Sequence, residues 1–177
     1  MKILPLALSL LGMWSLEART APAPPFGSSI TWNTSKESPS LDALHGKAVL
    51  VVFFQSWCPL CNNWSGDMFK SITEQFKDQP EVVLIALKTD GGSVREALEY
   101  LEGRMDTDRW LVGTDTNATY ARQATGVDRL YTYAWITPEG GIGESGKAGT
   151  TVSGSSPKRY WATRDAAREQ FLSSAKP

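Results

Sequence analysis

The two cysteines of this 177-residue chain are separated by two residues, in the run Trp57-Cys58-Pro59-Leu60-Cys61. A bridge between cysteines this close together closes a very short loop and restrains little chain entropy, so stabilisation is a poor reason to keep it. A Cys-x-x-Cys pair that follows a strand and opens a helix is typical of thiol–disulfide exchange. The pair therefore predicts redox chemistry, with an inert structural bridge as the alternative.

Two other uses of the cysteines fit the sequence less well. A structural zinc site needs four ligands, and besides its two cysteines the chain has a single histidine, His45, which we expect in a surface turn. Covalent haem attachment needs a histidine directly after the second cysteine, where this chain has Asn62. We therefore expect neither a metal nor a bound cofactor.

A strand and a helix are needed to position the cysteines, and the sequence predicts both. Residues 48–54 form a continuous run of apolar, β-branched and aromatic side chains, which is typical of a strand buried on both faces of a sheet. Beyond the cysteines, apolar residues recur at helical spacing and predict a helix over about residues 59–77. These residues are Trp64, Met68, Ile72 and Phe76.

The position of the cysteines relative to this helix predicts their roles. Pro59 suits the first helical position, because its missing N–H would have no partner there. Cys58 is then expected at the N-cap, where free N–H groups and the positive end of the helix dipole stabilise a thiolate. Cys61, one turn on, is close enough to attack a mixed disulfide at Cys58. We therefore predict Cys58 as the nucleophile and Cys61 as the resolving thiol. Trp57 is expected either to pack against a partner or to shield the core.

The rest of the chain alternates between strand and helix signals, which predicts an α/β fold with a central mixed β-sheet flanked by helices. The expected strands are a short one near residues 29–32, then 82–87, 110–112, 132–137 and 141–144, the last two joined by a turn at residues 138–140. The expected helices are one turn near residues 41–47, then 93–104, a helix capped by residues 115–117 and ending near Gly126, and 162–173.

The first residues predict export. Lys2 precedes an apolar run over residues 3–16, and the small residue Ala18 follows, which is a secretory signal pattern with cleavage near residues 18–20. The run is shorter than the ~20 residues that span a bilayer, so we expect no stable membrane span. The predicted division is a signal peptide at 1–20, an N-terminal lead-in at 21–40 and one domain at 41–177, in a periplasmic or secreted protein. A net charge of −1 argues against a nucleic-acid partner.

Residues 44–61, with Gly46-Lys47, the apolar strand and the Trp-Cys-x-x-Cys run, resemble the TlpA/ResA branch of the thioredoxin-like superfamily. Residues 126–141 are similar to the last strands of that family. The resemblance implies a thioredoxin-like fold over 41–177 and an extracytoplasmic thiol–disulfide oxidoreductase. Its implied partners are protein thiols and disulfides and a membrane or periplasmic electron donor, with a Cys58–Cys61 disulfide in the oxidised form.

The resemblance also implies a surface that contacts partner peptides. Its residues here are Trp57, Pro59, Leu60, Tyr131 and Thr132. Family members usually place a cis-proline where this chain has Tyr131, and Pro138 lies too far along to be its equivalent. A cis bond without proline costs ~2.5–4 kcal/mol, so we expect a trans bond before Tyr131.

Two acidic positions of the family are also changed, which leaves a second function open. Val52 and Trp64 stand where part of the family has acidic groups that handle the proton of the resolving cysteine. Together with Tyr131, these departures support an alternative: a thioredoxin-like binding or scaffold module with a non-catalytic disulfide.

Overall fold

The strand predicted at residues 48–54 is the central element of the fold. The computed structural model describes residues 21–33, 38–57, 59–126 and 132–146. In these residues β2 (Ala48–Phe54) is buried along its whole length. It pairs parallel with β3 (Val82–Lys88) and antiparallel with β5 (Thr132–Ile136), as expected for a strand with no polar face.

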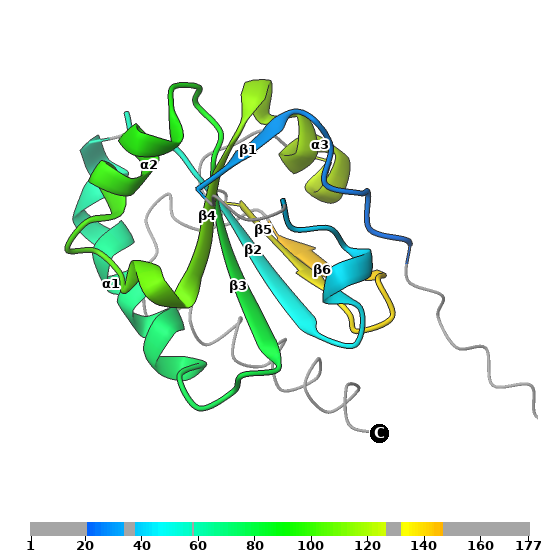
Figure 1. The fold of residues 1–177 in the computed structure, drawn as a ribbon. Helices are drawn as coiled ribbons and strands as arrows, with labels where there is room; N and C mark the ends of the chain where they lie inside the picture. Colours follow the sequence, from blue (N-terminus) through cyan, green and yellow to red (C-terminus); the bar gives the residue numbers. More distant parts are fainter. Residues whose placement is uncertain (1–20, 34–37, 58, 127–131, 147–177) are drawn as a thin grey trace, which may run out of the picture.

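The described residues form one mixed sheet of six strands in the order β1-β4-β3-β2-β5-β6 (Figure 1). The other strands are β1 (Ile30–Trp32), β4 (Trp110–Asp115) and β6 (Ile142–Gly146). The helices are α1 (Pro59–Gln75), α2 (Val94–Leu101) and α3 (Thr119–Thr125), with short 3-10 turns η1 (Asp42–Leu44), η2 (Thr107–Arg109) and η3 (Thr116–Ala118). This confirms the predicted α/β fold with a central mixed sheet flanked by helices.

Most predicted elements are present, with shifted ends. α1 stops two residues before the predicted end at Lys77, and α2 is shorter than the predicted 93–104. α3 ends where expected, because Gly126 takes a left-handed conformation (φ 71°) that suits a helix C-terminus. The predicted signal peptide and the predicted helix at residues 162–173 lie outside the described residues.

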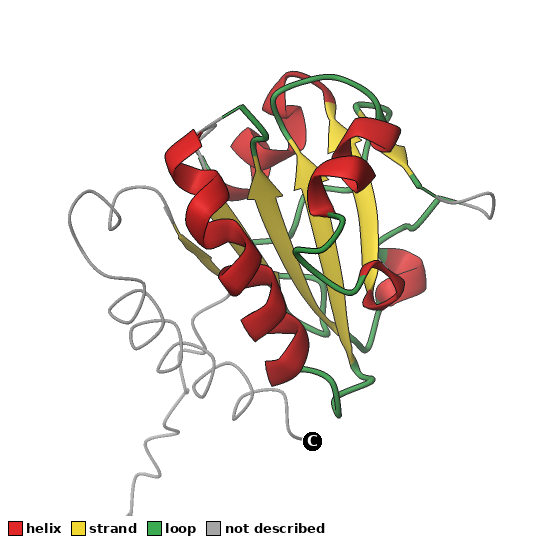
Figure 2. Ribbon diagram, turned by 90° about the vertical axis from the view of Figure 1, so that its left-hand side faces the viewer, coloured by secondary structure: helices red, strands yellow, loops and turns green. Residues whose placement is uncertain are grey.

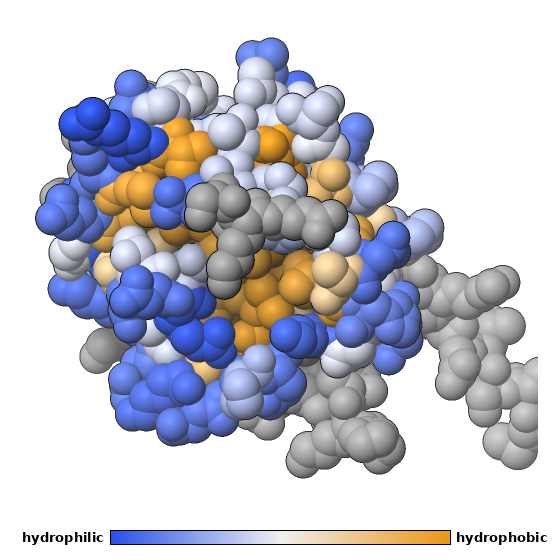
Figure 3. All heavy atoms as spheres, viewed as in Figure 1, coloured by the Kyte–Doolittle hydropathy of each residue, from blue (hydrophilic) through white to orange (hydrophobic). Residues whose placement is uncertain are grey.

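Helices cover the two faces of the sheet unequally (Figures 1 and 2). On one face α1 and α2 pack against the sheet through a cluster that includes Phe54, Phe69 and Trp135. On the other face α3 packs through a second cluster that includes Phe53 and Tyr120. Around this second cluster several apolar residues remain only partly buried, and in Figure 3 apolar surface is visible between the polar side chains.

Residues 21–32, predicted as a lead-in, contribute to the sheet at both of its edges. β1 pairs antiparallel with β4, with Ile30 opposite Asp115. At the other edge Pro22 forms an isolated bridge with Gly141, and the amide of Ala23 donates to the carbonyl of Gly140 (2.8 Å). The predicted strand near residues 29–32 is therefore confirmed.

Arg109 joins the region after α1 to the start of β3. Its Nη2 donates to the carbonyls of Phe76 (3.2 Å), Gln79 (2.9 Å) and Val82 (3.1 Å). The carbonyls of Phe76 and Gln79 also accept the amides of Gln79 (3.2 Å) and Val82 (3.1 Å), so the guanidinium adds a second, charged donor to this turn. This contact fixes how the chain turns from α1 into β3.

We expect Arg109→Met to lower the free energy of unfolding by about 1.5–3 kcal/mol, because charged hydrogen bonds to partly buried carbonyls are lost. Urea unfolding followed by circular dichroism measures the change. The matched control is Arg95→Met, since Arg95 is exposed and its ion pair, with Glu99 on the same helix, is exposed too. That control should change stability by less than about 0.5 kcal/mol. Equal stability of the two variants would contradict the role given to Arg109.

Candidate functional site

The cysteine run lies where β2 leaves the sheet and α1 begins. β2 ends at Phe54 and α1 begins at Pro59, and residues 55–57 are the described part of the chain between them. Cys61 belongs to the first turn of α1. Cys58 and the side chain of Cys61 lie outside the described part of the chain. The strand–connection–helix context predicted around the pair is confirmed, while the roles of the two sulfurs stay predictions.

The C-terminal ends of β2 and β3 lie side by side at the same end of the sheet, because the two strands run parallel with Phe54 opposite Lys88. The amide of Thr89 continues the pairing by donating to the carbonyl of Phe54 (2.9 Å), and its hydroxyl donates to the same oxygen (3.2 Å). The chain that follows β3 is therefore held beside the chain that leads to the cysteines.

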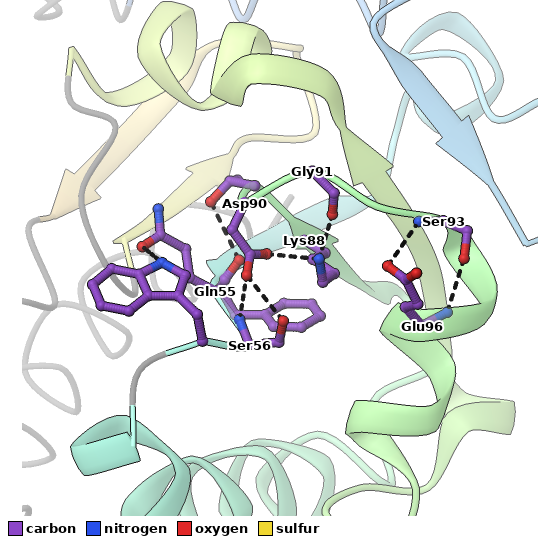
Figure 4. A network of polar contacts seen from close by, with 10 residues as sticks. Gln55, Ser56, Lys88, Asp90, Gly91, Ser93 and Glu96 are labelled. Carbon is purple, nitrogen blue, oxygen red and sulfur yellow. Dashed lines mark hydrogen bonds and ion pairs between the residues drawn. The ribbon is translucent and has the colours of Figure 1, made fainter.

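Ser56 is bound by a carboxylate from that neighbouring chain. Its amide and its hydroxyl both donate to Oδ2 of Asp90, each at 2.9 Å. Figure 4 shows Ser56 and Asp90 facing each other across the ends of β2 and β3. Two donors of one residue thus converge on a single oxygen, two positions before Cys58.

The same carboxylate forms a buried ion pair. Nζ of Lys88 lies 2.9 Å from Oδ1 of Asp90, and the two side chains are only 5% and 10% exposed. Lys88 also donates to the carbonyl of Gly91, so its ammonium lies inside the loop that connects β3 to α2 (Figure 4). We call Ser56, Lys88, Asp90 and Gly91 the Asp90 network.

The Asp90 network keeps the carboxylate ionised. Burial acts to raise the pKa of Asp90, but hydrogen bonds from Lys88 and Ser56 and the charge of Lys88 outweigh it, so the pKa lies below its usual value. An acid with a lowered pKa is poorly suited to accept or store a proton near neutral pH. Asp90 is therefore suited to binding Ser56 rather than to general acid–base catalysis.

The lowered pKa of Asp90 gives a pH dependence of stability. Because the folded-state pKa lies below the unfolded one, the stabilisation is complete above roughly pH 4–5 and is lost as the pH falls through the folded value. We expect Asp90→Asn to cost about 1–3 kcal/mol at pH 7, since Lys88 loses its buried counter-charge.

Urea unfolding at pH 7, 5 and 3 tests this dependence. The difference in the free energy of unfolding between wild type and Asp90→Asn should be smaller at pH 3 than at pH 7. Asp78→Asn, at an exposed position after α1, is the matched control and should follow wild type at every pH. A gap that stays constant down to pH 3 would mean that the ionised carboxylate is not what stabilises the fold.

The predicted peptide-contacting residues differ in exposure. Trp57 is 64% exposed, and its indole Nε1 donates to Oε1 of Gln55 (3.1 Å), an exposed contact. Its exposure does not fit a role in shielding the core. Thr132 begins β5 and the whole residue is buried, so in the described structure it presents no exposed surface to a peptide. Tyr131 and the side chains of Pro59 and Leu60 lie outside the described residues.

The sheet near the site is apolar at Val52, a position at which the sequence resemblance implies an acidic group in part of the resembled family. Val52 is buried in the cluster beneath α1 and α2, opposite Ala86 and Tyr133 in the neighbouring strands. The side chain of Trp64 is not among those described. In the described residues there is no group of three or more histidine, cysteine or acidic side chains able to hold a metal ion.

Sequence reasoning identified the cysteine run but missed the Asp90 network. A signal was present: Lys88 ends an otherwise apolar strand, and Asp90 precedes a Gly91-Gly92 turn. Since parallel strands end at the same edge, polar residues after one strand lie beside those after the next. The strand pattern alone does not show that β3 is the neighbour of β2.

Several solved structures similar to this chain are described as thiol–disulfide proteins. A candidate protein disulfide isomerase from Bacteroides thetaiotaomicron superposes with a TM-score of 0.64 at 23% identity, over 87% of this chain and 89% of that one. A candidate thiol:disulfide interchange protein DsbE from Chlorobium tepidum gives 0.59 at 20% identity, over 88% and 96%. A thiol-disulfide oxidoreductase from Bacteroides fragilis gives 0.57 at 22% identity, over 75% and 95%.

These likenesses show a thioredoxin-like fold, as the sequence resemblance predicted. No family model matches the sequence, and no curated protein is significantly similar to it. Among the described residues no helix combines the length and apolar character needed to cross a membrane.

Proposed function

We propose that this protein, which has a thioredoxin-like fold, is an exported thiol–disulfide oxidoreductase that exchanges disulfides with partner proteins through Cys58 and Cys61. The observation that carries the proposal is the place of the cysteine run, between the end of the buried strand β2 and the first turn of α1. This is the context in which a helix start lowers the pKa of a thiol.

The proposed reaction moves two electrons between the cysteine pair and a partner. The Cys58 thiolate attacks a partner disulfide, forms a mixed disulfide and releases one partner sulfur as thiolate. The Cys61 thiolate then attacks the Cys58 sulfur, which releases the second partner thiolate and leaves a Cys58–Cys61 disulfide. The partner is reduced and the pair is oxidised, and the reverse sequence oxidises a partner dithiol. No cofactor takes part in either direction.

Export and the kind of partner are part of the same proposal. The signal pattern at residues 1–20 supports a periplasmic or secreted location. Two structurally similar proteins are described as thiol:disulfide interchange proteins, which supports protein thiols and disulfides as substrates. An electron donor in the periplasm or its membrane would return the pair to the reduced state.

We expect the two cysteine variants to fail in different ways. Cys58→Ser should abolish insulin reduction, because no nucleophile remains. Cys61→Ser should accumulate a mixed disulfide with the substrate, because the resolving thiol is missing. Gel electrophoresis without reductant, after alkylation of the free thiols, separates these products. If Cys58→Ser reduces insulin as fast as wild type, the protein is instead a binding or scaffold module.

The reduction potential of the Cys58–Cys61 couple, measured against glutathione, decides the direction of electron flow. A value near about −120 mV indicates an oxidant of partner thiols, and one near about −270 mV a reductant. A value below roughly −300 mV is typical of a structural disulfide and would contradict the proposed activity.

We expect Trp57→Ala to slow the reaction with a peptide disulfide several-fold while leaving the fold intact. The side chain is 64% exposed, so its loss should change the free energy of unfolding by less than about 0.5 kcal/mol. A small aromatic disulfide is the control substrate, because it offers no peptide for the indole to pack against. Equal slowing with both substrates would show that Trp57 acts on the thiol rather than on the partner.

A further inference from the structure

The amide of Ser56 lies just past the last regular hydrogen bond between β2 and β3. The pairing ends with the amide of Thr89 donating to the carbonyl of Phe54. A continued parallel ladder would next give the amide of Ser56 a carbonyl of the neighbouring strand. It finds the Asp90 carboxylate instead, at 2.9 Å. The Asp90 side chain thus takes the place of the next backbone carbonyl and adds one more hydrogen bond between the chain after β2 and the chain after β3.

The ion pair behind this contact is hard to explain by stability alone. Lys88 and Asp90 are 5% and 10% exposed, so both charges have lost most of their water. A buried pair often contributes no more stability than apolar residues of the same volume, because desolvation offsets the attraction. What the pair does provide is a direction for the carboxylate: Oδ1 faces the Lys88 ammonium at 2.9 Å, and Oδ2 accepts the hydrogen bonds from Ser56.

The loop that follows β3 is built to hold the pair in this direction. Gly91 and Gly92 both take left-handed conformations (φ 80° and 83°), which allows the Gly91 carbonyl to turn toward Lys88. A Cβ at Gly92 would lie 1.9 Å from Oε2 of Glu96 and 3.2 Å from Nζ of Lys88. Glu96 is itself fixed by a capping box with Ser93 at the start of α2 (Figure 4).

We propose that Asp90 is a positioning residue for the redox site: through Ser56 it fixes the path of the chain from the end of β2 toward the cysteine run. The inference rests on the proposed function, because it concerns the same thiol. It assigns no contact between Asp90 and substrate. Lys88 and Gly91 act one step further away, by fixing the carboxylate.

Two other roles for Asp90 predict different results. As a nearby charge acting through space, the carboxylate would disfavour the Cys58 thiolate, so its removal would lower the thiol pKa. As a general base it would add its own titration to the pH dependence of the reaction. A positioning role predicts the opposite change from the through-space charge effect. Without Asp90, a displaced Cys58 would lose the helix N–H groups, and its pKa would rise.

The test is to titrate Cys58 as the sole thiol of the full chain, in a Cys61→Ser background, from the pH dependence of its alkylation by iodoacetamide. We expect Asp90→Ala to raise the Cys58 pKa by about 0.2–0.7 pH units, the size of a helix-terminus effect. Ser56→Ala should raise it by less, because the amide still binds the carboxylate. Ser56→Thr, which keeps the hydroxyl, should restore most of the wild-type value.

Ser71→Ala and Asp78→Asn are matched controls at exposed positions on and after α1, and both should titrate like the background. An unchanged or lowered pKa in Asp90→Ala would overturn the proposal. So would a normal Cys58 pKa in Ser56→Ala, since the proposal gives the bond from the Ser56 hydroxyl a share in holding the connection. If Asp90→Ala does not fold, Ser56→Ala and Ser56→Thr decide, because they leave the ion pair intact.

The titration needs no turnover, so the two proposals can fail separately. A wild-type protein that does not reduce insulin, with the expected shifts in Cys58 pKa, would contradict the proposed activity and support the positioning role. Normal insulin reduction by the wild-type protein, with no shift of the Cys58 pKa in Asp90→Ala or Ser56→Ala, would support the proposed activity and contradict the positioning role.

Discussion

The burial of β2 on both faces is the constraint on which the rest of the structure depends. Every residue of Ala48–Phe54 is buried, so the strand needs a paired neighbour on each side and a layer on each face. β3 and β5 provide the first, and α1, α2 and α3 provide the second. The first polar residues after β2 therefore lie beside the end of β3. The chain begins α1 at the same end of the sheet.

This constraint explains why so much of the fold could be predicted from sequence and why the Asp90 network could not. An unbroken apolar strand, a proline at a helix start and a glycine at a helix end are local signals, and β2, Pro59 and Gly126 appear where those signals place them. The contact between Ser56 and Asp90 joins residues that are distant in the sequence. It exists because β3 pairs with β2, and no local sequence pattern predicts that pairing. The network becomes visible only when the order of the strands is known.

The charged groups near the site are arranged differently from those implied by the family resemblance. Val52 leaves the sheet beneath α1 apolar, while the buried charges of Lys88 and Asp90 lie at the end of the neighbouring strand. A carboxylate at the position of Val52 could exchange a proton with a thiol. The ion-paired Asp90 instead stays ionised and accepts hydrogen bonds from Ser56. The described residues thus give the site a fixed backbone rather than a proton acceptor.

The way residues 21–32 contact both edges of the sheet bears on the order in which the molecule folds. Their partners, Asp115 on one edge and Gly140 and Gly141 on the other, are made long after them during synthesis. Closing such long loops is slow, so β1 must wait for the sheet to assemble before it can join. Residues 21–32 therefore join the sheet after their partners are in place, as its outer strand beside β4 and as a single bridge near the turn between β5 and β6.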